Sequence, residues 1–444
     1  MTYVPHTDAD IEAMLAFLGL SGTDELFSAV PDALRLVGGL DLPAGRDEFD
    51  VYERMRELAG VNRAAELVCF AGAGAYDHDV PAVTRALAGR SEFVTAYTPY
   101  QPEVAQGVLQ ALFEFQTLVS RLSGLPVANA SLYDGASACV EGANLAAAHT
   151  GRQTLWVSSG VHPHWRAAME TFAAGTGHRL VDVALEGGTT RWPDEGDEPG
   201  ALILQYPNFL GCIEDLGAAR AVADRHGALL VVAADPVAAG LLRTPGELGA
   251  DVVVGEGQPL GLPLSFGGPY LGLFSCMLPL VRRLPGRLVG ETVDSTNRRA
   301  YVTTLRAREQ DIRREKASSN VCTNQTLMAV TAAIQLSWLG TGGLRELALR
   351  CARGARYTRE ALSAVDGIEP VSTGPTLREF AVRCPRPAED VIERMAEEGF
   401  LAGVAVREGF EGTEYEGALL VAVTEKRTRA QIDAFAAALE KAVR

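Results

Sequence analysis

The chain has 444 residues, of which 47% are hydrophobic and 22% charged, a composition typical of globular proteins with one or more large domains. Its formal net charge of −16 argues against binding to nucleic acid or to an anionic membrane, since both require an excess of lysine and arginine. The apolar runs are too short to cross a bilayer and the first residues do not resemble a signal peptide, so we expect a cytoplasmic protein.

The N-terminal part predicts a helical arm, residues 1–60, that packs on another body. Thr7 can cap its first helix, with Asp10 as the acid of a capping box, and apolar residues recur at helical spacing up to Leu18. The other helices expected ahead of the first strand cover residues 23–30, 50–90 with a glycine-rich break at 70–76, 107–123 and 138–149.

Residues 61–330 predict a large α/β domain, because short apolar strands alternate there with amphipathic helices. The expected strands are residues 155–158, 179–185, 201–205, 229–234, 251–254 and 270–274, and the expected helices between them are 163–174 and 216–226. Strands this short and apolar indicate a mainly parallel sheet that helices cover on both faces.

Residues 331–444 predict a small C-terminal α+β domain. The expected elements are helices within residues 320–361, a strand at 379–383, a helix at 388–398, and strands at 401–406 and 418–424. Thr428 and Gln431 have the spacing of a second capping box, which marks the start of a final helix.

Two features of the large domain indicate a ligand crevice at one edge of the sheet. Gly135, Ala136 and Ser137 stand where a loop meets a helix, and small residues there let backbone N–H groups approach a phosphate, although the same residues also form a common helix cap. Asp235 follows the apolar strand 229–234. A carboxylate at that place can pair with a pyridinium nitrogen, or it can simply fix the following turn.

Lysine is rare in this chain, which contains only Lys316, Lys426 and Lys441. In sheets of this class that bind pyridoxal phosphate (PLP), the lysine that forms the Schiff base follows the strand after the aspartate. Gln258 or Pro259 holds that place here, and neither can form an imine. We therefore expect the frame of a PLP enzyme without covalent PLP, which works only with a partner chain.

Five ordered segments carry a resemblance to a known family. They are residues 97–107 (YTPYQPEVAQG), 128–137 (ANASLYDGAS), 267–270 (GGPY), 285–294 (PGRLVGETVD) and 308–325 (REQDIRREKASSNVCTNQ). The residues of these segments and the order of the segments resemble the glycine decarboxylase P-protein of the glycine cleavage system, specifically subunit 1 of its two-chain bacterial form. The resemblance extends over effectively the whole chain.

The resemblance implies a fold type I PLP-dependent transferase architecture and an αβ or α2β2 assembly with a second subunit that carries PLP. Together the two subunits would decarboxylate glycine and transfer its aminomethyl group to the lipoyl arm of H-protein. PLP assists by delocalising the carbanion that decarboxylation leaves. This chain itself is then expected to hold no covalent cofactor and no metal.

Subunit 1 is expected to contribute side chains to a shared active site. The candidates in the first segment are Tyr97, Tyr100, Gln101 and Glu103, which could equally form an aromatic loop that only packs at the subunit interface. The candidates further along are Thr292, Arg306, Arg308, Glu309 and Gln310. An arginine among these could bind a carboxylate or a phosphate as a bidentate fork, whereas the charge-dense run is also typical of a solvated helix face.

His162 lies in a His-Pro-His sequence, but two histidines without a third ligand do not predict a metal site. In this fold His162 could stack on a PLP ring, and with Gly135, Ala136, Ser137 and Asp235 it makes up the expected vestigial cofactor site. Two other functions stay open. One is a self-sufficient PLP homodimer, which Gln258 and Pro259 argue against, and the other is a structural or regulatory subunit without a direct role in the active site.

Overall fold

The computed structural model describes residues 5–36, 38–265 and 267–444. The described chain divides after Ala65 into two compact units. The first unit contains the helices α1 (Asp8–Leu18) and α2 (Glu48–Val61) and the 3-10 helices η1 (Thr23–Phe27) and η2 (Asp32–Leu34). None of its described residues is buried, so this unit has no core of its own.

The capping box predicted at the first helix is confirmed. The Thr7 hydroxyl accepts the N–H of Asp10 at 3.3 Å, and the Asp10 carboxylate accepts the N–H of Thr7 at 2.8 Å. A short helix begins at the predicted residue, Thr23, but it is a 3-10 helix that ends at Phe27 and does not reach Val30. Gly22, which precedes that helix, has no side chain that could cap an α-helix.

The second unit is built on a seven-stranded sheet with the strand order β2-β10-β9-β8-β7-β3-β4. Its strands are β2 (Val127–Ala128), β3 (Thr154–Ser158), β4 (Arg179–Val183), β7 (Ala201–Tyr206), β8 (Leu229–Ala234), β9 (Val252–Glu256) and β10 (Gly272–Cys276). The strands β4, β3, β7, β8 and β9 pair in parallel, while β10 is antiparallel to both β9 and β2. The predicted mainly parallel sheet is therefore confirmed.

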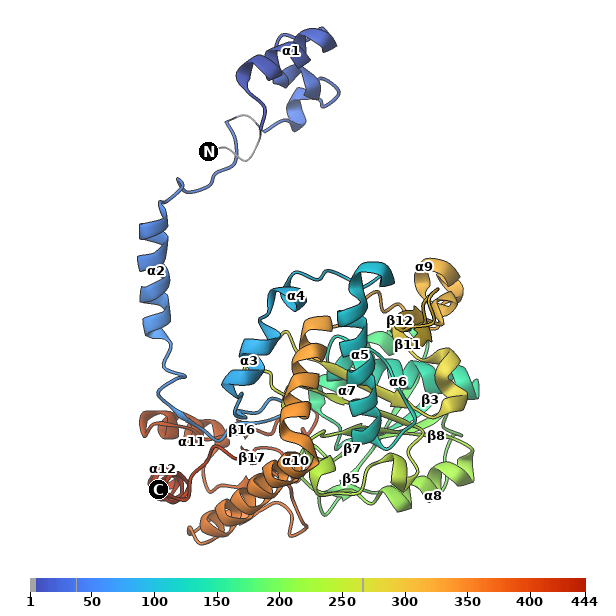
Figure 1. Cartoon of the computed structure of the whole chain (residues 1–444). Coiled ribbons are helices and arrows are strands. Elements are labelled where there is room, and N and C mark those ends of the chain that lie inside the picture. Colours follow the sequence, from blue (N-terminus) through green and yellow to red (C-terminus); the bar gives the residue numbers. More distant parts are fainter. Residues whose placement is uncertain (1–4, 37, 266) are drawn as a thin grey trace. The chain divides into compact units, whose positions relative to one another are not determined.

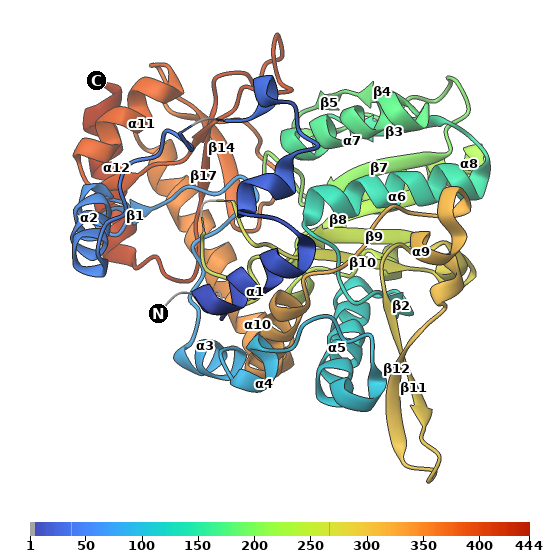
Figure 2. The same ribbon diagram turned by 90° about the horizontal axis from the view of Figure 1, so that it is seen from above.

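Helices cover both faces of this sheet, as the sequence predicts (Figure 1). They include α5 (Pro102–Ser123), α6 (Gly135–Thr150), α7 (Pro163–Thr176) and α8 (Leu216–His226), whereas α3 (Ala82–Ala88) and α4 (Ser91–Val94) pack on the later helix α10 (Thr326–Ser363). Neighbouring residues of β8 face opposite sides: Val231 packs in the same buried cluster as residues of α6, whereas Leu230 packs with residues of α8. Figure 2 shows α6 lying over the central strands and running alongside β7 and β8.

The C-terminal part begins with α10 (Thr326–Ser363), which is interrupted at Gly340. A four-stranded sheet follows in the order β13-β14-β17-β16. Its strands are β13 (Glu369–Pro370), β14 (Glu379–Arg383), β16 (Val404–Ala405) and β17 (Leu419–Ala422), and its helices are α11 (Ala388–Glu397) and α12 (Arg429–Val443). The capping box of Thr428 and Gln431 at the start of α12 is confirmed.

Short strands account for most differences from the predicted elements. β1 (Val68–Cys69) lies in a stretch for which a helix is predicted, and it pairs in parallel with β15 (Phe400–Leu401). The strand predicted for residues 401–406 is wrong as one element, because Gly403, at φ +152°, separates β15 from β16. Further elements that the sequence did not predict include β2 and β13, β5 (Leu185–Glu186) with β6 (Thr189–Thr190), β11 (Leu288–Val293) with β12 (Arg299–Thr304), η6 (Arg306–Arg308), α9 (Gln310–Arg313) and η7 (Arg314–Lys316).

In the described chain, α10 is the helix that is long and apolar enough, by composition alone, to cross a membrane. Many of its apolar side chains pack against protein. Ala329 and Ala332 belong to a buried cluster with α5, and Ala355 and Leu362 belong to the cluster of the C-terminal sheet. The predicted boundary between the large and small domains, at residue 330, falls within this core helix and stays a prediction.

Candidate functional site

The crevice predicted at the carboxyl ends of the central strands is nearly filled by side chains. Asp235 and Pro259, which follow β8 and β9, share with His162 a cavity of only about 40 Å³. Tyr76, Glu256 and Arg378 are among the other residues that line it. Pockets for small organic ligands have volumes of roughly 300 Å³ or more, so this cavity is too small for a cofactor.

Arg378, which directly precedes β14, forms an ion pair with the aspartate of the crevice. Its guanidinium lies 2.8 Å from a carboxylate oxygen of Asp235. The same guanidinium lies 3.5 Å from the centroid of the Tyr76 ring and 2.6 Å from Nε2 of His78. Asp235 is therefore engaged by an arginine of its own chain and is not free to pair with a pyridinium nitrogen.

The start of α6 has the small residues of a phosphate cradle, but carboxylates of the same chain take its N–H groups. Glu256 Oε2 accepts the N–H of Gly135 at 2.9 Å, and the other oxygen accepts two further backbone N–H groups. The N–H of Ser137 donates to Asp134 at 2.7 Å, while Ala136 lies between these two contacts. The cradle predicted from the sequence thus exists in form and is occupied by protein.

Glu256 should make the stability of the chain depend on pH. Burial raises the pKa of Glu256 to about 7 from an ordinary value of 4.5, although three backbone N–H groups oppose that rise. Between these values the folded chain holds a proton that the unfolded chain has lost, so Glu256 contributes less stability as the pH rises. We expect the free energy of unfolding of the wild type, relative to that of Glu256→Gln, to fall by up to about 3 kcal/mol as the pH rises through this window, from 4.5 to about 7. Urea denaturation below and above the window measures it, and an unchanged difference would contradict this assignment.

Gln258 and His162 are also held by the backbone of their own chain. The buried amide of Gln258 bonds with both the N–H and the carbonyl oxygen of Tyr76, at 2.9 and 3.0 Å. His162 Nε2 donates to the carbonyl oxygen of Ala73 at 2.9 Å, while its other ring nitrogen accepts a backbone N–H, and burial lowers the pKa of His162 to about 4. A methyl group at Gly74 would lie 2.9 Å from the ring. His162 is therefore covered and cannot stack on a ligand ring.

The residues of this crevice do not fit PLP. The chain offers no amine at Gln258 or Pro259, no unpaired Asp235 for the pyridinium nitrogen, and no free N–H of Gly135 for the phosphate. The space that is left could not hold the ring in any case. In the described part of the chain, the residues predicted as a vestigial cofactor site contact protein groups and leave no room for PLP. They are Gly135, Ala136, Ser137, His162 and Asp235.

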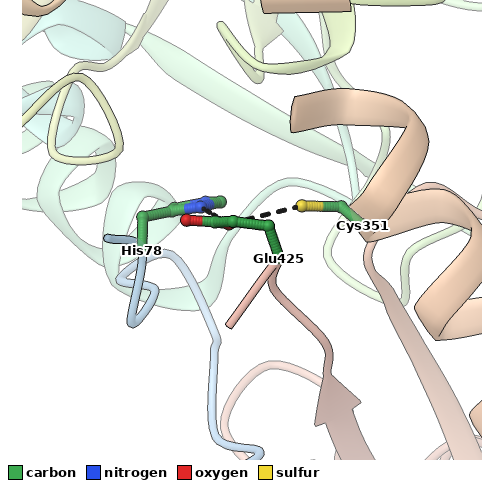
Figure 3. Close-up of side chains that lie close together, drawn as sticks. All are labelled: His78, Cys351 and Glu425. Atoms are coloured by element: carbon green, nitrogen blue, oxygen red, sulfur yellow. Dashed lines mark hydrogen bonds and ion pairs between the residues drawn. The ribbon is translucent and has the colours of Figure 1, made fainter. Parts of the chain in front are cut away.

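Three potential metal ligands, His78, Cys351 and Glu425, meet in another buried place (Figure 3). Because Arg378 can only donate, His78 Nε2 must accept from it, which leaves Nδ1 to donate to Glu425 at 2.6 Å. Neither ring nitrogen then has a free lone pair for a metal. The Cys351 thiol lies 3.8 Å from Glu425, and burial raises its pKa to about 12. The cluster is a hydrogen-bonded extension of the Asp235–Arg378 pair.

The candidate residues of the first segment lie at the surface. Tyr97, Tyr100 and Gln101 line a groove of about 890 Å³ ahead of α5, and Glu103 is exposed in the first turn of that helix. The Tyr97 side chain is 89% exposed. The helix begins at Pro102, about one turn earlier than predicted. Exposed aromatic rings beside a groove are typical of surfaces that bind a partner.

Tyr100 connects this loop with the second group of candidates. Its ring centroid lies 4.6 Å from the guanidinium carbon of Arg287 and 5.8 Å from that of Arg306. Its hydroxyl accepts a hydrogen bond from Arg287 Nη2 at 2.5 Å. The sequence singled out Tyr100 and Arg306, and the structure brings them together. It did not single out Arg287, which stands in the segment 285–294 next to apolar residues.

The other candidates of the second group lie in different surroundings. Arg308 turns inward, where it donates to the carbonyl oxygen of Leu284, and burial lowers its pKa. Its Nε and Nη2 atoms and one carboxylate oxygen of Glu309 are buried without a partner among the described residues. Gln310 begins α9, while Thr292 is exposed on β11 and lines neither cavity in the described chain.

The sequence matches a known protein family and proteins of known description over nearly its whole length. The glycine cleavage system P-protein family matches residues 1–439. The chain is 48% identical to the probable glycine dehydrogenase (decarboxylating) subunit 1 of Moorella thermoacetica. It is 44% identical to the protein of the same description from Desulforamulus reducens, and each alignment covers 99% of both chains.

Solved structures agree with these matches. The crystal structure of glycine decarboxylase (P-protein) of the glycine cleavage system, in inhibitor-bound form, superposes with a TM-score of 0.92 at 45% identity, covering 100% of both chains. Glutamate decarboxylase from Lactobacillus brevis, at 13% identity, superposes with a TM-score of 0.67 over 94% of this chain and 97% of its own, and this shows a shared fold alone. The fold type I PLP-dependent architecture expected from the sequence is confirmed. With its whole length matched in sequence and structure, the chain belongs to the glycine cleavage system P-protein family.

Proposed function

We propose that this chain is subunit 1 of a two-subunit glycine dehydrogenase (decarboxylating) in the cytoplasm. With a second subunit that carries PLP, it decarboxylates glycine and passes the aminomethyl group to the lipoyl arm of H-protein. The relatives described as subunit 1, which are 44% and 48% identical over the whole chain, support this function. The word "subunit" in their description also supports a partner chain of the same family.

One contrast within the second unit carries the proposal. The crevice in which a fold type I enzyme holds its cofactor is filled here by Glu256 and by the Asp235–Arg378 pair. The aromatic loop that contains Tyr97 and Tyr100, in turn, borders a large open groove. A chain that cannot hold the cofactor and still exposes aromatic rings at a groove is suited to complete the site of another chain.

In this proposal Tyr97, Tyr100, Gln101, Glu103 and Arg306 face the active site of the second subunit. PLP, when bound there, supplies the electron sink for decarboxylation. The side chains of this chain bind and orient the reacting groups and exclude water from them. The unpartnered buried atoms of Arg308 and Glu309 support a surface that a partner completes, because buried polar atoms are normally hydrogen-bonded.

Reconstitution from separately purified subunits tests the function. We expect exchange of labelled bicarbonate with the carboxyl group of glycine in the mixture of both subunits and in neither subunit alone. We also expect PLP to remain, after dialysis, with the second subunit and with the complex only. Exchange by this chain alone would establish a self-sufficient enzyme, and full exchange by the second subunit alone would establish a structural subunit. Either result contradicts the proposal.

A further inference from the structure

Arg287 is the most extensively bonded side chain beside the exposed loop. It is 4% exposed, and its two terminal nitrogens make four hydrogen bonds. These go to the Tyr100 hydroxyl at 2.5 Å, the Cys322 carbonyl oxygen at 3.0 Å, and the Thr323 hydroxyl and Asn324 amide oxygen at 3.2 Å each. The guanidinium also lies against the Tyr100 ring, 4.6 Å from its centroid.

These contacts join parts of the chain that are far apart in sequence. Arg287 directly precedes β11, Tyr100 precedes α5, and residues 322–324 precede α10. The carbonyl oxygen of Arg287 additionally accepts the N–H of Ala130 at 2.9 Å, just after β2. The side chain of Arg287 therefore joins the surface loop to the segment before α10, and its backbone joins both to the segment after β2.

The partners of Arg287 carry no negative charge. Among the described residues, no carboxylate lies within ion-pair distance of Arg287, although buried arginines usually pair with an acid. These neutral partners accept hydrogen bonds from the planar guanidinium, which presents several donors in a fixed geometry. A lysine ammonium does not have this geometry. The chemistry of the contacts thus favours a geometric role over a role as a charge.

We infer that Arg287 is a positioning residue of the shared active site, which it serves by holding the phenol of Tyr100 at the groove. The inference rests on the proposed function, because it gives Tyr100 a task in the assembled enzyme. It predicts that Arg287 acts through Tyr100. In a variant that lacks the hydroxyl of Tyr100, replacement of Arg287 should therefore lower kcat little further.

The test is a double-mutant cycle of Arg287→Lys and Tyr100→Phe in the complex of both subunits. We expect each variant to lower kcat for bicarbonate exchange about 10-fold or more, since a misplacement of about 1 Å costs that much. We expect the double variant to be about as slow as the slower single variant. Affinity between the subunits and the KM for glycine should stay close to wild type. Arg283→Gln, at an exposed arginine on η5 (Leu278–Arg283), is the matched control.

The outcomes separate this inference from the function on which it rests. If Tyr100→Phe has the kcat of the wild type for bicarbonate exchange, Tyr100 does not belong to the shared site, and the inference about Arg287 is wrong as well. A slow Tyr100→Phe beside a wild-type Arg287→Lys, or effects that multiply in the double variant, would overturn the inference alone. If Arg287→Lys does not fold, Thr323→Val removes one acceptor and leaves the arginine in place. That variant should be a few-fold slower and non-additive with Tyr100→Phe, and a wild-type rate would overturn the inference.

Discussion

Replacement of Arg378 by methionine is expected to lower the free energy of unfolding by about 3–5 kcal/mol. Arg378 is 3% exposed, and its guanidinium bonds with Asp235 and His78 while it covers the ring of Tyr76. Without it, the carboxylate of Asp235, whose side chain is only 15% exposed, is left with no counter-charge and close to Glu379. Urea denaturation of the purified chain measures the loss.

Arg383→Met is the matched control for this change, because Arg383 lies at the other end of β14 with a side chain that is 40% exposed. Its ion pair with Glu414 should contribute no more than about 1 kcal/mol. A second substitution, Asp235→Asn, should restore part of the stability that Arg378→Met loses, since it removes the unpaired charge. A loss below about 1 kcal/mol for Arg378→Met would contradict the role of the pair as a structural element of the crevice.

Gly211→Ala is expected to destabilise the chain by at least about 3 kcal/mol. Gly211 has φ +83°, and a methyl group there would lie 1.9 Å from the backbone oxygen of Glu379 in β14. Neither backbone segment can give way easily, because Asn208 and the strand β17 hold them on either side. The change should therefore loosen the contact between the turn after β7 and the C-terminal sheet.

Gly177→Ala separates the clash from the backbone strain. Gly177 ends α7 with φ +77°, close to that of Gly211, but a methyl group there would meet nothing within 4 Å. It should cost only about 1 kcal/mol, the strain of a non-glycine residue at positive φ. Equal losses for the two variants, in the same urea denaturation assay, would show that the close approach to Glu379 does not matter.

The main elements of the fold follow from local patterns in the sequence. β7 and β8 are apolar runs bounded by turns, and α1 and α12 begin at capping boxes that can be read from a residue and its third neighbour. β1 and β5 could not be found this way, because a two-residue strand has no alternation and exists only through its partner. His162 and Asp235, which the sequence groups in one crevice, line the same cavity in the structure, while their role stays a prediction.

What fills the crevice could not be predicted, because it depends on contacts between distant residues. Glu256 and Gly135 lie 121 positions apart, and no local pattern announces that the carboxylate of one caps the N–H of the other. The same holds for Arg378 with Asp235 and for Arg287 with Tyr100. A single arginine among apolar residues carried no signal of its role, whereas the aromatic segment around Tyr100 stood out by composition.

The carboxylate of Glu256 at the start of α6 has a consequence for the history of the chain and for its redesign. A lysine introduced at Gln258 would forfeit the bonds of that amide to Tyr76 and would still find the neighbouring cradle taken. We therefore expect that Gln258→Lys alone would not give an independent catalyst, because Asp235 and the N–H of Gly135 would remain engaged by Arg378 and Glu256. In the proposed function, a single substitution of this kind would leave the chain dependent on the second subunit.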